Sequence, residues 1–308
     1  ITANADMYLT PDTMIEASRD CGYRTTVIGA VNNFTQSVEL LDEWYKKYHK
    51  KENLINFELG FHAEYTTKKE ILEGIADLAE KYKAPVYTHN SESESEVAQC
   101  IERTKVTPTV YMDRLGIFNY GGGFYHCVHM TQNDLDIVKE HNISVITNPA
   151  SNLKLASGIA PIDHMLKEGI NLAIGTDGPA SNNCLDMFRE MFLVTALAKY
   201  RENDASAVDA LEVLKMATIG GAKAMNLTDC DVLAEGKEAD IIMIDLNQPN
   251  MQPIHNIQKN LVYSGSKQNV KLTMVAGKIL YENGEFFIGT DAYKIYEKAN
   301  DIAERIVK

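Results

Sequence analysis

The sequence predicts an α/β fold and, within that class, a (β/α) barrel. Four short apolar segments have strand character, and a segment with helical character separates each from the next. Each of the four ends on or just before a titratable side chain, namely His62, His89, His126 and Asp177. A barrel gathers the carboxyl ends of all its strands at one active-site rim, whereas an open doubly wound sheet gathers them only near one switch point. The barrel therefore accounts better for the pattern.

The first part of the chain alternates between predicted strands and helices. Pro11 suits the first turn of a helix, where its missing N–H costs nothing, and Gly22 is placed to end that helix. Thr67 and Glu70 have the spacing of a capping box at a helix start. In order, we expect a strand at 1–8, a helix at 11–22, a strand at 24–31, a helix at 37–50, the strand before His62, a helix after Glu70, the strand before His89, a helix at 92–103 and another from Thr107.

The second part of the barrel contains the longest predicted loop. Thr131 and Asp134 are expected to cap a helix that reaches His141. A polar stretch at 148–158 follows a strand, and long loops in compact domains tend to be functional, so we expect it at the active-site rim. Strands are predicted before His126, at 143–147 and at 170–175, and helices at 161–169, 185–200 and 205–218.

The pattern changes after about residue 227, which predicts a second domain. Segments 239–246, 270–275 and 278–282 have strand character, and Gly277 and Asn283-Gly284 mark turns between them. An amphipathic helix is predicted at 291–308. We therefore expect a barrel at 1–226, a small all-β appendage at 227–289 and a C-terminal helix at 290–308.

Charge and cysteine content narrow the class of protein. The formal charge of −13 disfavours nucleic acids and anionic membranes as partners. The 5 cysteines are scattered and form no Cys-x-x-Cys pair, so we expect a reducing, cytoplasmic location rather than disulfides or a thiolate zinc site. The sequence has neither a long apolar segment that could span a membrane nor a leader pattern. Because Ile1 reads as part of a strand already under way, we expect residues upstream of it.

His89 and Glu92 are the sharpest pair of candidate site residues. A neutral imidazole binds a divalent metal, and a nearby glutamate that is not a ligand can move protons between bound water and substrate. The alternative is that Glu92 begins a solvated acidic face, since Glu94 and Glu96 follow it.

Asp177 stands at the mouth of a buried strand and is followed by Gly178 and Pro179. An ionised carboxylate there needs a cation, a metal or several donors to offset its desolvation. The alternative is that Asp177 forms an Asx-turn or caps a helix near Ala180.

Of the other histidines, some are candidate site residues and some are not. His126 suits a donor or electrostatic stabiliser beside the metal, and its alternative is a barrel histidine bonded to backbone. His62 suits substrate contact, with a satisfied core histidine as the alternative. His129 is expected to be structural. His49 is expected to face solvent because lysines surround it on a predicted helix.

Three ordered motifs resemble those of a known family. They are His126-Cys-Val-His129, the run NPASNLKLASGIAP at 148–161, and the run GTDGPASNN at 175–183. Together they are similar to motifs of the amidohydrolase superfamily, above all its methylthioadenosine/S-adenosylhomocysteine deaminases, with chlorotriazine hydrolases and guanine deaminases as relatives. The resemblance extends over essentially the whole chain.

The resemblance implies a role for each candidate residue. His89 and Asp177 would bind one divalent metal, Zn²⁺ or alternatively Fe²⁺, and Asp177 would also accept a proton. Glu92 would contact the substrate and shuttle protons, His126 would lie near the attacking hydroxide, and His62 would contact the substrate. The implied activity is hydrolytic deamination of an adenine nucleoside or a related small N-heterocycle.

The chain also departs from the family pattern. The family's first strand carries His-x-His, two further metal ligands, and this motif is absent from the 308 residues. The strand at Ile1 resembles the family's second strand, so we expect an incomplete (β/α)8 TIM barrel with strands 2 to 8 and half of a β-sandwich, inactive without the two missing ligands. Gly29 and Ala30 stand where the adenosylhomocysteine branch uses arginines, so the exact substrate stays open. Alternatives are a guanine deaminase, a chlorotriazine-type hydrolase, or a metal-free binding barrel; a homo-oligomer is compatible with each.

Overall fold

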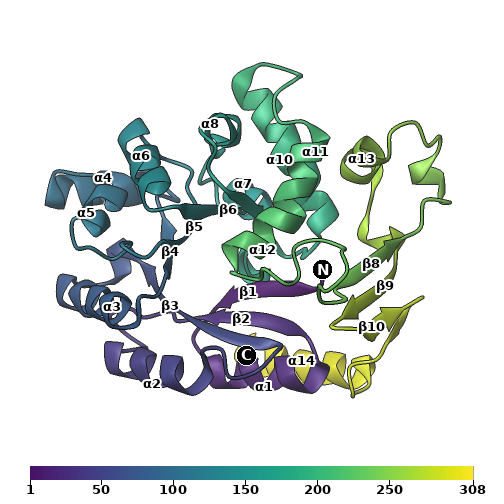
Figure 1. Ribbon diagram of the computed structural model, residues 1–308, viewed down its shortest axis with the longest axis horizontal. Coiled ribbons are helices and arrows are strands. Elements are labelled where there is room, and N and C mark those ends of the chain that lie inside the picture. The colour runs from purple at the N-terminus through teal and green to yellow at the C-terminus, as the bar shows by residue number, and fades with distance from the viewer. Residues whose placement is uncertain (308) are drawn as a thin grey trace.

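A seven-stranded parallel sheet forms the body of the protein. A computed structural model describes residues 1–307. The sheet curls in the order β1 to β7, each strand pairing with the next along the chain (Figure 1). Within the described residues β1 and β7 are its two edge strands, so the predicted incomplete barrel is confirmed. The strands are β1 (Ala3–Met7), β2 (Arg24–Ile28), β3 (Ile55–Ala63), β4 (Val86–Asn90), β5 (Gly122–His126), β6 (Ile143–Thr147) and β7 (Leu172–Ile174).

Helices follow the strands, and most of them cover the outer face of this sheet (Figure 1). Gly22 ends the first of them in the left-handed conformation, with φ +72°, as its position in the sequence predicts. The helices are α1 (Pro11–Cys21), α2 (Val38–Tyr48), α3 (Lys69–Tyr82), α4 (Glu94–Thr104), α5 (Pro108–Asp113), α6 (Gln132–Glu140), α7 (Pro149–Lys154), α8 (Ile162–Lys167), α9 (Pro179–Asn182), α10 (Met187–Glu202), α11 (Ala210–Lys215) and α12 (Gly221–Ala224).

Alternation along the strands separates two apolar clusters. In β3, Phe57, Leu59 and Phe61 are fully buried in the larger cluster between sheet and helices. On the opposite face, Ile28, Tyr87 and Tyr125 form a smaller cluster. Because successive side chains of a strand point to opposite faces, the polar residues between the apolar ones in β3 face the inside of the curled sheet.

A second, antiparallel sheet lies beside the N-terminal ends of the first strands (Figure 1). Arg24 at the start of β2 binds Asp240, with Nε–Oδ2 at 2.8 Å and Nη2–Oδ1 at 2.9 Å, and both side chains are buried. The domain boundaries at 226/227 and 289/290 stay predictions. The sheet and its neighbours comprise β8 (Ile241–Ile244), β9 (Val270–Val275), β10 (Lys278–Glu282), β11 (Glu285–Phe286), α13 (Ile257–Lys259) and α14 (Ala292–Val307). Lys308, the last residue of the predicted C-terminal helix, lies outside the described residues.

Two local predictions are wrong. Thr67 and Glu70 do not form a capping box, because the Thr67 hydroxyl donates to the carbonyl of Ala63 and α3 begins after Lys68. His49 does not face solvent, because its ring stacks on Tyr45 at 4.2 Å.

The predicted loop at 148–158 also differs from the structure. Its first half is the short helix α7, which begins at Pro149. Proline in the first turn favours a helix, but the sequence prediction gave more weight to the polar composition of this stretch. In the part of the chain that the structure describes, no helix has the length and apolar character to cross a membrane.

Candidate active site

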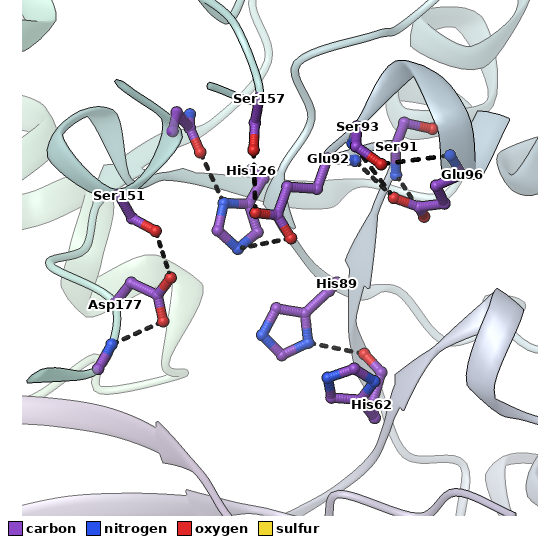
Figure 2. A network of polar contacts seen from close by, with 12 residues as sticks. His62, His89, Ser91, Glu92, Ser93, Glu96, His126, Ser151, Ser157 and Asp177 are labelled. Atoms are coloured by element: carbon purple, nitrogen blue, oxygen red, sulfur yellow. Dashed lines mark hydrogen bonds and ion pairs between the residues drawn. The ribbon is translucent and has the colours of Figure 1, made fainter. Parts of the chain in front are cut away.

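The strand ends that carry the candidate residues meet at one rim of the sheet (Figure 2). The ring centroids of His62 and His89 are 5.0 Å apart, and those of His89 and His126 are 5.5 Å apart. Figure 2 shows Glu92 beside His126, and Asp177 on the far side of the same space. The structure therefore brings together all five residues that the sequence singles out.

The backbone at these strand ends is strained. Ser91 after β4, His126 and Cys127 at the end of β5, and Asp177 after β7 have φ of +51°, +71°, +50° and +58°. Residues other than glycine rarely adopt this left-handed conformation, and such positions concentrate at active sites. These residues turn the chain sharply after β4, β5 and β7, at the rim where the candidate residues lie.

His89 is held as a neutral ring with one free nitrogen. Its Nδ1 lies 2.6 Å from the carbonyl oxygen of His62, and because a carbonyl only accepts, Nδ1 carries the proton. Burial lowers the pKa of His89 to about 3, with nearby His126 and His62 adding to the shift. Nε2 is therefore unprotonated at neutral pH, which is the form that binds a metal.

Asp177 is held as a carboxylate. Burial acts to raise its pKa, but donation from the Ser151 hydroxyl to Oδ2 at 2.6 Å and from the Gly178 N–H to Oδ1 at 2.6 Å outweighs burial. The net pKa lies below the usual value for aspartate. Gly178, not Asp177, precedes α9, so the helix-capping alternative does not describe this residue.

Glu92 and His126 face each other without a direct hydrogen bond. Glu92 Oε2 is 3.8 Å from His126 Nε2, while Oε1 accepts from the Ser157 hydroxyl at 3.2 Å. His126 Nδ1 donates to Asn152 Oδ1 at 2.7 Å, which leaves Nε2 directed at the Glu92 side of the site. The Glu92 side chain is only 22% exposed and lies before α4, so it does not belong to a solvated helix face.

His62 has a defined tautomer. Its Nδ1 lies 2.9 Å from the Thr66 hydroxyl, which itself donates to the carbonyl of Ala63 at 3.1 Å. Nδ1 is therefore the donor and Nε2 is free to accept a hydrogen bond. Burial lowers the pKa of His62, so the ring is neutral at neutral pH.

The segment from α7 to Ser157 contacts three of the candidate residues. The sequence did not identify any residue of this segment as part of the site. Ser151 donates to Asp177, Asn152 accepts from His126, and Ser157 donates to Glu92. Neutral hydroxyl and amide side chains carry no local signal of such a role. Only the expected rim position of 148–158 pointed toward them.

Glu96 was also missed, because the sequence suggested an acidic surface face. It is 5% exposed, and its carboxylate accepts from the backbone N–H of Ser91 at 3.1 Å, of Glu92 at 2.9 Å and of Ser93 at 3.4 Å. These bonds fix the turn that carries Glu92. Burial raises the pKa of Glu96, and the three N–H donors act in the opposite direction.

His89 and Asp177 fit a divalent cation in chemical type. An unprotonated imidazole nitrogen whose other nitrogen donates to a carbonyl, opposite an ionised carboxylate, is a common donor set for zinc. Within residues 1–307 no group of three or more His, Cys, Asp or Glu side chains is close enough to hold one ion. Among the described residues, one ion could therefore be shared by at most two such side chains, where catalytic zinc sites commonly use three.

Comparison with known proteins identifies relatives of this chain. The family model described as the amidohydrolase family matches residues 1–280. A 5-methylthioadenosine/S-adenosylhomocysteine deaminase of Thermoanaerobacter pseudethanolicus is 36% identical over 316 residues, which cover 99% of this chain and 73% of the relative. A 5′-deoxyadenosine deaminase of Methanopyrus kandleri is 34% identical, with 99% and 72% covered.

A solved structure is similar in fold over the same length. An adenosine deaminase from Xanthomonas campestris, solved with bound zinc, superimposes with a TM-score of 0.94 at 31% identity. The match covers 99% of this chain and 71% of that protein.

Proposed function

This chain belongs to the amidohydrolase family, and we propose that it is a metal-dependent hydrolytic deaminase of adenine nucleosides. One observation carries the proposal: an unprotonated His89 nitrogen, an ionised Asp177 and a partly buried Glu92 converge on one rim. The deaminase names of the relatives, above 30% identity over nearly the whole chain, support the same reaction class.

We assign one divalent metal, Zn²⁺ first, to His89 and Asp177. A bound metal of this kind supplies an activated water by lowering the pKa of that water to about 7. The two residues suit the task because neither must lose a proton at neutral pH before it binds. The zinc in the similar adenosine deaminase supports this choice of metal.

Deamination replaces a ring amine by an oxygen from water and releases ammonia, so the site must move protons from water to the ring and the leaving amine. Glu92 is suited to this transfer because Ser157 fixes one carboxylate oxygen and the other faces the centre of the site. Asp177 accepts the second proton at its carboxylate. His126 is oriented by Asn152, and because its Nδ1 already donates there, it stabilises negative charge near the water oxygen only in the form that carries a proton on Nε2 as well.

His62 is assigned to the substrate. Its neutral ring presents Nε2 as an acceptor for a substrate N–H or O–H, since the Nδ1–H donates to the Thr66 hydroxyl. The most conservative substrate set is the one that the relatives name: methylthioadenosine, S-adenosylhomocysteine and 5′-deoxyadenosine.

The test is ammonia release by the full-length, zinc-loaded protein from these three nucleosides, adenosine and guanine. Glu92→Gln keeps the shape of the side chain but cannot take a proton, so kcat should fall by about 10² to 10⁴. Glu94→Gln, two residues away on the exposed face of α4, is the matched control and should stay within about twofold of wild type. A Glu92→Gln rate within about threefold of wild type would refute the proton-transfer role. Ammonia from guanine alone would replace the adenine-nucleoside proposal by a guanine deaminase.

A further inference from the structure

Glu190 is a buried carboxylate outside the residues assigned to the reaction. It lies on α10, behind the rim, and is 0% exposed. Its Oε2 accepts from the backbone N–H of Ala150 at 3.0 Å, and its Oε1 accepts from Asn182 Nδ2 at 2.9 Å. Burial raises the pKa of Glu190, and these two donors oppose the shift.

Both partners of Glu190 lead to Asp177. Ala150 is in the first turn of α7, next to Ser151, whose hydroxyl donates to Asp177. Asn182 Nδ2 also donates to the carbonyl of Thr176 at 2.6 Å, one residue before Asp177. One carboxylate therefore joins the two segments that meet at Asp177, one through each oxygen.

The same link extends to the other candidate residues. Because α7 and the residues after it also carry Asn152 and Ser157, a shift of α7 would move the hydrogen-bond partners of His126 and Glu92. Lys154, at the end of α7, additionally donates to the carbonyl of Ala180 at 2.7 Å in α9. Helices α7, α9 and α10 are thus tied together behind the site.

We propose that Glu190 is a positioning residue for the deaminase site. It acts through α7 and the turn at Thr176, so that the Ser151 hydroxyl and the Asp177 carboxylate keep their 2.6 Å contact. This inference rests on the proposed function, since it deepens the account of the same site. Among the described residues, the Glu190 carboxylate has no hydrogen bond to His89 or Asp177.

A carboxylate is the chemically required group at this place. Both partners are donors, so a glutamine would have to present its own NH₂ to one of them and leave two donors facing each other. A buried charge also needs its hydrogen bonds to offset desolvation, so an apolar side chain would fill the core at lower cost if packing were the only role.

The experiment uses the full-length, zinc-loaded protein with Glu190→Gln, and with Glu202→Gln as a matched control at the exposed end of the same helix. In Glu190→Gln we expect kcat to fall about 10- to 100-fold with KM within about threefold, and a chelator to remove zinc at least about tenfold faster. Glu202→Gln should match wild type in all three. The rate at which the chelator removes zinc does not depend on activity, and a merely structural role would not change that rate in a folded variant.

A double-mutant cycle with Ser151→Ala tests the route. If Glu190 acts through Ser151 and Asp177, Glu190→Gln costs less in the Ser151→Ala background than in wild type. If Glu190→Gln fails to fold, Asn182→Ala breaks the same link without removing the carboxylate and decides by the same readouts. Folded variants that keep wild-type kcat and wild-type zinc release, or effects that multiply independently, would overturn the proposal. If the wild type released no ammonia at all, the proposed function would fall, and zinc release alone would decide the role of Glu190.

Discussion

Glu58 is expected to make the stability of the fold depend on pH near neutrality. It lies on β3 and is 1% exposed; Oε1 accepts from Asn56 at 2.8 Å, and Oε2 has no hydrogen-bond partner among the described residues. His49 Nδ1 is 3.6 Å from Oε2, but that nitrogen lies 2.8 Å from the carbonyl of Phe57 and donates there. Burial therefore dominates, and it raises the pKa of Glu58 to about 7.

The magnitude follows from the displaced pKa. The folded protein holds a proton on Glu58 up to about pH 7, while the unfolded chain releases it near the ordinary value of 4.5. Between these values the native state binds more protons, so the free energy of unfolding falls as pH rises. At about 1.36 kcal/mol per pKa unit, the full loss is about 3 kcal/mol, most of it between pH 5 and pH 8.

The assay is urea unfolding of wild type and Glu58→Gln at pH 5 and pH 8. The amide does not titrate, so between these pH values Glu58→Gln should gain about 2.5 kcal/mol relative to wild type. Glu70→Gln on the exposed face of α3 is the control, and its difference from wild type should stay constant with pH. A Glu58→Gln difference that changes by less than about 0.5 kcal/mol would refute the reasoning, since Glu58 would then be ionised in the fold at both pH values.

Two further changes test the fold at the N-terminal ends of the strands, opposite the candidate site. Arg24→Ala leaves the buried Asp240 without its bidentate partner. The free energy of unfolding, measured with urea, should fall by about 3–5 kcal/mol. A loss under about 1 kcal/mol would mean that water replaces the guanidinium. Gly122→Ala puts a Cβ 1.8 Å from the Val86 carbonyl oxygen at φ +147°. Thermal unfolding should therefore show that the free energy of unfolding falls by roughly 3 kcal/mol or more. A wild-type unfolding midpoint would contradict the close approach of β4 and β5.

The sequence predicted the strand-end residues because their signal is local. In β4 a short apolar run stops at His89, and the same pattern repeats at His62, His126 and Asp177, so the alternation of strands and helices sufficed to place them on one rim. The sequence also predicted the helix cap at Thr131, because Thr131 and Asp134 are only three residues apart. Their side chains form the expected capping box.

The supporting residues could not be predicted in the same way. Ser151 is 26 residues from Asp177, Ser157 is 65 from Glu92, and Glu190 is 40 from Ala150 along the chain. Their roles arise only when the sheet brings α7, α9 and α10 together, and a serine or glutamate in isolation has many surface roles. The capping box predicted at Thr67 was wrong for a different reason. The Thr67 hydroxyl donates to the nearby carbonyl of Ala63 and so does not cap the helix.

The most direct measurement is ammonia release from methylthioadenosine by the full-length protein before chelation, after chelation, and after zinc is restored. We expect ammonia release to stop when the metal is removed and to return when zinc is added, in wild type but in neither His89→Ala nor Asp177→Asn. Release that continues at the wild-type rate without metal, or in both variants, would contradict the assignment of His89 and Asp177 as the residues that hold the metal.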